Sequence, residues 1–143
     1  MLVKGRLTKT VLTLGLIAMS CGLASAQAKP EQLAQQSADA WVGLVDSGKY
    51  AQSWDEAAPA FKSAVTKGQW QDALNKVRDP LGKTISRKLK SATYTKNLPN
   101  APEGEYVVIQ YDTSFQNKSS AVETITPMLD KDGTWKVSGY FIK

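Results

Sequence analysis

The segment EYVVIQYDTSFQ, residues 105–116, decides the fold of this protein. Its apolar side chains recur with a period of two and so share one face of an extended chain: Val107, Ile109, Tyr111 and Phe115. Successive side chains of a strand point to opposite faces, so this alternation is the signature of a half-buried β-strand. We therefore predict a strand over about residues 105–116.

The same period extends to both sides of this segment. It predicts three further strands, at about residues 83–96, 121–129 and 135–142. Residues with turn chemistry separate the strands, at 97–104, 117–120 and 130–133. Because short links join antiparallel neighbours, the four strands are expected to form a meander.

The alternation also predicts which strand faces are buried. In the last strand one face carries Trp135, Val137, Gly139 and Phe141, which are expected to join the core. The second and last strands also carry apolar residues on the opposite face: Tyr106, Val108, Tyr140 and Ile142. That second face indicates a pocket, a dimer surface or cover by loops, and the pattern leaves these alternatives open.

Residues 30–78 have helical periodicity instead. Apolar residues at spacings of three and four predict a first helix that Gly48 ends with a left-handed cap. A short second helix is predicted over residues 51–58, stopped near Pro59. Thr66 and Gln69 form a capping-box signature that begins a third helix.

Helices followed by an antiparallel meander predict an α+β fold, with three N-terminal helices packed on one face of a curled four-stranded sheet. A length of 143 residues suits one hydrophobic core. We expect a single domain over residues 27–143.

The first 26 residues have the layout of a cleaved secretory signal. A cationic start precedes an apolar run at residues 11–19, and Ala24-Ser25-Ala26 is a small-x-small site that predicts cleavage after Ala26. Two alternatives are a lipoprotein attached through Cys21 and an uncleaved anchor, but the apolar run is shorter than the ~20 residues that span a bilayer. We expect a periplasmic or secreted domain, with no transmembrane segment after cleavage.

Composition excludes several classes of function. The net charge of the whole chain is +5, and Lys4, Arg6 and Lys9 supply three of those charges from the signal, so overall basicity gives little support to nucleic-acid binding. The chain has no His, and its one Cys lies in the signal. A Ser-His-Asp triad, a Cys nucleophile and a zinc site with nitrogen and sulfur ligands are therefore excluded. With no glycine-rich phosphate loop either, no cofactor and no metal are expected.

Carboxylates and tyrosines are the remaining candidates for catalysis. Asp112 and Glu123 lie on neighbouring predicted strands, near Tyr106 and Tyr111. A carboxylate in an apolar sheet can act as a general base beside a tyrosine donor, as in isomerase pockets. The alternative is that both acids face water and pair with lysines.

A basic cluster on the first predicted strand comprises Lys83, Arg87, Lys88 and Lys90. These side chains could bind an anionic component of the envelope. The alternative is that they protect a sheet edge against pairing with another chain.

The order of several short motifs resembles a bacterial family catalogued as domain of unknown function 4019. The motifs are Ala40-Trp41, Asp46-Ser47-Gly48-Lys49-Tyr50, Ser53-Trp54, Gln69-Trp70, Leu81-Gly82, Ser86-Arg87, Gly104-Glu105-Tyr106 and Asp132-Gly133-Thr134-Trp135-Lys136-Val137-Ser138-Gly139-Tyr140. More distantly, the layout is similar to cystatin-like and nuclear-transport-factor-like folds, which often hold a cone-shaped pocket and include isomerases and binding modules. Those folds usually have a pair of strands between their helices, and no such pair is predicted in this chain. The likeness implies no catalytic residue.

These observations favour a non-enzymatic exported domain that binds a small apolar ligand or a protein partner through its sheet face. A cofactor-free isomerase-like enzyme and a binder of an anionic envelope component are the alternatives. The sequence does not indicate an oligomeric state.

Overall fold

The computed structural model describes residues 26–143. The predicted signal segment and Cys21 lie outside these residues, apart from Ala26. Five helical segments precede the strands: α1 (Pro30–Asp46), α2 (Tyr50–Asp55), α3 (Pro59–Ala64), α4 (Lys67–Val77) and the 3₁₀ turn η1 (Asp79–Leu81). In this part of the chain no helix combines the length and the apolar character needed to cross a membrane.

Helix α1 begins and ends as its sequence predicts. Pro30 occupies the first turn, where its missing N–H costs nothing. At the other end Gly48 has φ +73°, and its N–H donates to the Val45 carbonyl at 3.1 Å. The Lys49 N–H donates to the Leu44 carbonyl at 2.9 Å, which completes a Schellman cap. The predicted left-handed cap is confirmed.

The prediction of three helices is wrong, because the structure has four α-helices before the sheet. Residues 59–64 form α3, with Pro59 in its first turn. A proline stops the helix before it, but its fixed φ also favours the start of a new one. Helix α4 begins at the predicted capping box, where Gln69 N–H donates to Thr66 Oγ1 at 3.2 Å and Thr66 N–H donates to Gln69 Oε1 at 3.0 Å.

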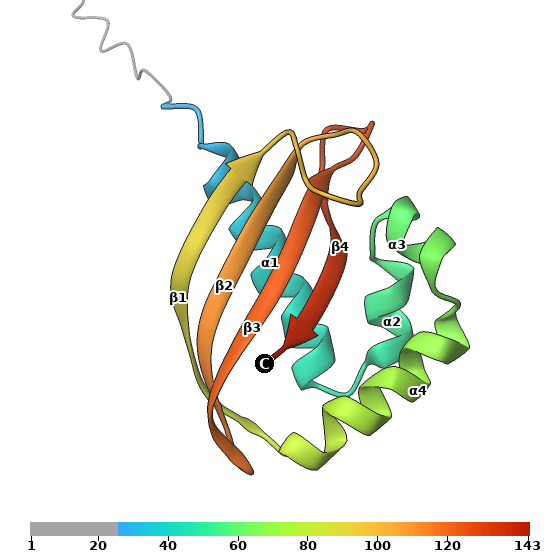
Figure 1. The fold of residues 1–143 in the computed structure, drawn as a ribbon, viewed down its shortest axis with the longest axis vertical. Helices are drawn as coiled ribbons and strands as arrows, with labels where there is room; N and C mark the ends of the chain where they lie inside the picture. The colour runs from blue at the N-terminus through green and yellow to red at the C-terminus, as the bar shows by residue number, and fades with distance from the viewer. Residues whose placement is uncertain (1–25) are drawn as a thin grey trace, which may run out of the picture.

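The predicted antiparallel meander is confirmed. Strands β1 (Thr84–Thr95), β2 (Tyr106–Phe115), β3 (Lys118–Leu129) and β4 (Trp135–Ile142) form one sheet in the order β1-β2-β3-β4. Strand β3 begins three residues earlier than predicted, so the β2–β3 link is a tight hairpin. Helix α1 contacts all four strands, whereas α2, α3 and α4 form a group beside β4 (Figure 1).

The core lies between α1 and the sheet and continues into the group of short helices. Aromatic rings fill the region where the two parts meet. The Trp70 ring lies 6.0 Å from Trp41 and 4.9 Å from Phe61, centroid to centroid. The indole N–H groups of Trp41 and Trp70 both donate to Ser53, which is fully buried, at 2.7 Å and 2.9 Å. Ser53 therefore satisfies two buried donors at once.

The predicted core face of β4 is wrong beyond Val137. Thr126 pairs with Gly139 while Pro127 pairs with Val137, so Ser138 is the extra residue of a β-bulge. The bulge shifts the alternation by one residue. Tyr140 consequently packs on Trp41, at 5.5 Å between ring centroids, and Phe141 is 50% exposed on the other face.

Loop cover and the same bulge account for most apolar residues predicted on the outer face of the sheet, the face away from α1. Tyr106 is only 1% exposed and lies against the loop before β2, where its hydroxyl donates to the Pro102 carbonyl at 2.7 Å. Past the bulge, Tyr140 and Ile142 pair with the inward-facing Ile125 and Glu123. Of the four residues predicted on the outer face, Val108 remains exposed in part, and Phe141 joins it on that face.

Candidate functional site

Two arginines and two carboxylates meet beneath one end of the sheet, in what we call the charged cluster: Asp46, Arg78, Arg87 and Glu123. Asp46 ends α1 and Arg78 follows α4, while Arg87 and Glu123 come from β1 and β3. Four separate elements therefore converge here through ionised side chains.

Glu123 is fully buried and its carboxylate is occupied by protein donors. Oε1 accepts from Arg87 Nε and from Thr113 Oγ1, both at 2.7 Å. Oε2 accepts from the Tyr140 hydroxyl at 2.5 Å, and Arg78 Nη1 lies 3.7 Å away. Paired and hydrogen-bonded in this way, the carboxylate serves structure and offers no oxygen to a substrate.

Asp46 joins the two arginines from the other side. Its oxygens accept from Arg87 Nη1 at 2.7 Å and from Arg78 Nη2 at 3.0 Å. Partial burial alone would raise the pKa of Asp46, but the hydrogen bonds and charge of Arg87 outweigh it and hold that pKa below its usual value. Burial likewise opposes the charge of Arg87, yet Asp46 and Glu123 raise its pKa. Asp46 and Arg87 are therefore ionised at neutral pH.

Of the four predicted catalytic residues, the structure places Tyr111 and Glu123 side by side and the other two elsewhere. Asp112 lies on the outer face, where its side chain is 61% exposed and 3.7 Å from Lys90. Tyr106 is covered by the loop before β2. Tyr111 lies directly across from Glu123 on the inner face, but its hydroxyl donates to Asp39 of α1 at 2.5 Å. The alternative, in which both acids face water and pair with lysines, describes Asp112 but not Glu123. Glu123 pairs with arginines.

The four predicted basic residues also lie in different places. Arg87 points inward to the charged cluster, and Lys83, Lys88 and Lys90 are exposed. Strand β1 is an edge of the sheet, and two register shifts interrupt its pairing with β2. Exposed lysines combined with bulges are the devices that protect an edge strand.

Sequence reasoning missed Asp46 and Arg78 as site residues. One signal for Asp46 was present: an acid in the last turn of a helix opposes the helix dipole, so it needs a cationic partner. Arg78 is 4% exposed, and its Nε has no hydrogen-bond partner among residues 26–143. No pattern in the sequence distinguishes it from the exposed cations around it.

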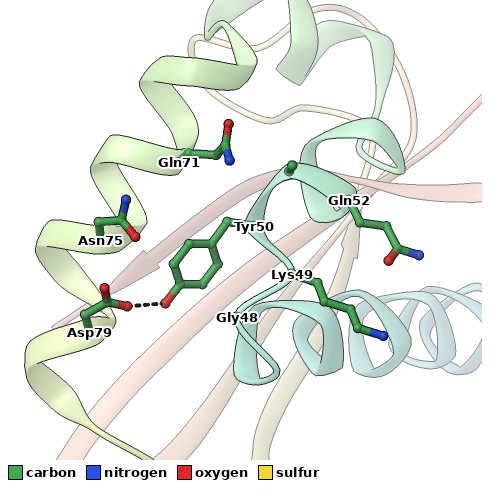
Figure 2. A pocket seen from close by; sticks show the side chains of 8 residues that line it. Gly48, Lys49, Tyr50, Gln52, Gln71, Asn75 and Asp79 are labelled. Carbon is green, nitrogen blue, oxygen red and sulfur yellow. Dashed lines mark hydrogen bonds between the residues drawn. The ribbon is translucent and has the colours of Figure 1, made fainter.

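A second site is an open groove of about 600 Å³ between the α1–α2 turn and α4, which we call the polar groove. Gln71, Asn75 and Asp79 line it from α4 and η1 and point toward Tyr50 of α2, whereas Lys49 and Gln52 point away from α4 (Figure 2). The amides of Gln71 and Asn75 form no hydrogen bond with another described residue. They are therefore available to a ligand.

Tyr50 fixes one end of the polar groove. Its hydroxyl donates to Asp79 Oδ1 at 2.6 Å (Figure 2). Burial and this hydrogen bond raise the pKa of Tyr50 to about 12. The phenol therefore stays protonated at neutral pH and donates its proton in the hydrogen bond to Asp79. Its oxygen is left free to accept a hydrogen bond.

The polar groove adjoins the charged cluster. A second groove of about 330 Å³ shares Gly48, Tyr50 and Asp79 with it and is also lined by Asp46 and Arg78. The ion pairs thus fix the end of α1 and the start of η1, which are two walls of the polar groove. Within residues 26–143, no three His, Cys, Asp or Glu residues gather to hold a metal ion.

Comparison with protein families gives a match over most of the chain. Residues 37–140 match the family described as "Protein of unknown function (DUF4019)", a span that includes the charged cluster and the polar groove. No curated protein matches the chain. Since the match covers well over half of the sequence, the chain belongs to the DUF4019 family.

Proposed function

We propose that this protein is a non-enzymatic binding module of the bacterial envelope that holds a small polar ligand in the polar groove. One observation carries the proposal: the amides of Gln71 and Asn75 have no described partner and point into an open groove opposite Tyr50. A few polar groups that converge on a hollow can fix the orientation of a ligand bound there.

Binding is favoured over catalysis by the state of the carboxylates. A general base must reach the proton that it removes, within hydrogen-bond distance or through one water molecule. Glu123 is buried under two arginines, Thr113 and Tyr140, and Asp112 is exposed with no tyrosine as its partner. Neither acid is hydrogen-bonded to Tyr106 or Tyr111, the tyrosines of the isomerase hypothesis, so the geometry favours binding.

A polar ligand is favoured over an apolar one by the packing of the core. Trp41, Trp70 and Tyr140 fill the space where the helices meet the sheet, so a ligand has to bind at the surface. The polar groove offers amide, phenol and carboxylate groups there. The expected likeness to cystatin-like and nuclear-transport-factor-like folds, some of which are binding modules, is compatible with this proposal and stays a prediction.

A protein partner on the outer face of the sheet is the second candidate. Phe141 favours it, because it is 50% exposed on this face, where Val122 and Val108 on the other strands are only half-buried. The bulge at Ser138 is what turns Phe141 outward.

Fragment mapping by NMR tests the first candidate against the second. Residues 27–143, which contain every described element, are ¹⁵N-labelled and mixed with separate pools of small amides, polyols and aromatic fragments. We expect shift changes from the polar pools at Tyr50, Gln71 and Asn75, since the two amides lack protein partners and Tyr50 lines the groove beside them. Changes confined to Phe141 and Val108 would replace the proposal with the second candidate, and fragments that move neither region would contradict both.

The envelope location rests on the predicted signal. Protein isolated from the bacterial envelope should begin at Gln27, which N-terminal sequencing measures directly. A chain that still begins at Met1 and stays in the cytoplasm would contradict this part of the proposal.

A further inference from the structure

We propose that the ligand of the polar groove is a neutral saccharide chain, held by the row Gln71, Asn75 and Asp79 and stacked on the ring of Tyr50. This inference rests on the proposed function and names the ligand class. Three features of the groove carry it: the spacing of the row, the aromatic wall and the balance of charge.

The three side chains of the row follow one another at intervals of four residues, on α4 and the turn that continues it. In an α-helix this interval places Gln71 and Asn75 on one face, about 6 Å apart along the axis, and Asp79 follows them in the 3₁₀ turn. One sugar ring has a comparable length, so each step of the row can meet one unit of a chain. The row thus suits a short linear oligomer better than a single compact molecule.

Each group in the row suits hydroxyl recognition. An amide presents an acceptor oxygen and a donor NH₂ in one plane, and a carboxylate presents acceptors only. A sugar hydroxyl both donates and accepts, so neighbouring hydroxyls can bond both atoms of the Asn75 or Gln71 amide. Asp79 already accepts from Tyr50 through Oδ1, and Oδ2 has no partner among the described residues.

Tyr50 supplies an aromatic surface beside the row. Its side chain stands between Asp79 and the rest of the groove (Figure 2), with its hydroxyl tied to Asp79 at 2.6 Å. A ring fixed at its polar tip is pre-organised, which reduces the entropy lost on binding. The C–H face of a sugar ring is apolar and can lie on such a ring while the hydroxyls reach the amides.

The charge of the groove disfavours an anionic ligand. Lys49 and Asp79 are the charged residues among those that line it, one of each sign, and Lys49 points away from α4. An anion would meet Asp79 without a facing cation. An extended peptide is also disfavoured, because helices and a turn form the walls and offer no strand edge for backbone pairing.

Isothermal titration calorimetry with neutral tetrasaccharides tests the inference, using the β-linked tetramers of glucose and of N-acetylglucosamine and the α-linked tetramer of glucose. We expect at least one to bind with a millimolar or tighter dissociation constant. Asn75→Ala should weaken that binding about tenfold, the loss of one hydrogen-bonding group. Lys76→Ala, next to it on the same helix but outside the groove, should leave the binding unchanged.

The outcomes separate this inference from the proposed function. If polar fragments still map to Tyr50 and Asn75 but no tetrasaccharide binds at millimolar concentration, the ligand class is wrong and the binding site stands. Tight binding of an acetylated tetrapeptide, or of an alkylammonium ion, in the same groove would likewise overturn the saccharide. If fragments avoid the groove altogether, the site itself is wrong. Equal weakening by Asn75→Ala and Lys76→Ala would place the saccharide elsewhere on the protein.

Discussion

At the scale of single residues, the burial of Glu123 decides what the inner face of the sheet can do. A fully buried carboxylate is costly unless its charge is paired and its oxygens are hydrogen-bonded, and Glu123 has both kinds of partner. Arg87 divides its guanidinium between Glu123 and Asp46, so the two acids are joined through one side chain. The cluster therefore acts as a fixed internal support.

Replacing Glu123 by Gln tests this support. Arg87 would lose a buried counter-charge, and we expect the free energy of unfolding to fall by about 3 kcal/mol, as for other broken buried pairs. Asp112→Asn is the matched control, since Asp112 is exposed and its pair with Lys90 is 3.7 Å long. That change should stay within about 0.5 kcal/mol. Urea unfolding curves of both variants measure the difference, and equal curves would contradict the structural role of Glu123.

Asp46 predicts how stability depends on pH. Its pKa is held below its usual 3.8 in the folded protein, so its ionised form stabilises the fold above that pH. The contribution is lost as the pH falls through the lowered pKa. Asp46→Asn should therefore be less stable than the wild type at pH 7, with a gap that narrows as the pH falls below about 4. Urea unfolding between pH 2.5 and 7 measures the gap, and a constant gap would contradict the assigned ion pairs.

At the scale of elements, turns and caps position the site. The Schellman cap at Gly48 reverses the chain after α1 and brings Tyr50 to the wall of the polar groove. Gly82 turns the chain from η1 into β1, with φ +72° and ψ −156°. Both glycines have positive φ, but only Gly82 has other atoms close to the position of a Cβ. Comparing the two therefore separates backbone strain from steric crowding.

Alanine at the two glycines should have unequal effects. A Cβ at Gly48 meets nothing within 4 Å, so Gly48→Ala should cost only the left-handed strain, about 1 kcal/mol. A Cβ at Gly82 would lie 2.8 Å from Gln116 Oε1, in a backbone region that is almost restricted to glycine, so Gly82→Ala should cost about 2 kcal/mol or more. Gly68→Ala, in the first turn of α4 with open space around it, is the control. Thermal unfolding ranks the three, and a cost at Gly48 that exceeds the cost at Gly82 would contradict this reading.

The elements also explain what the sequence could predict. Alternation and turn residues predicted the four strands and their order, because each signal is local. The bulge at Ser138 could not be predicted, since Val-Ser-Gly-Tyr reads as regular strand and only the packing of Tyr140 on Trp41 requires the shift. The sequence-based prediction omits helix α3 because it treats Pro59 only as the end of the helix before it.

The candidate site was less predictable than the fold, because the register of the strands decides which side chains face inward. Arg87 and Glu123 were both singled out, but for different roles, since they lie on strands separated by β2. Two register shifts in β1 decide that Arg87 faces inward, and a shift of one residue reverses every side chain. Gln71 and Asn75 carried no signal, because amides on a helix are ordinary surface residues.

At the scale of the whole molecule, the helices and the sheet have different roles. Helix α1 and the aromatic core close the inner face of the sheet, the lysines and bulges of β1 suit an edge that stays unpaired, and the group of short helices carries the polar groove (Figure 1). The groove lies where α1 ends and the chain turns toward β1, over the charged cluster. A binding site built on this support is expected to be rigid before its ligand arrives.

The most direct test of the groove is the NMR response of its side-chain amides. In a titration of the ¹⁵N-labelled protein with the best-binding tetrasaccharide, the NH₂ signals of Gln71 and Asn75 should both shift, because they exchange water for sugar hydroxyls. The NH₂ signal of Gln110, on the outer face of the sheet, should stay in place. Movement of Gln110 with Gln71 and Asn75 unchanged would contradict the account and place the ligand on the outer face.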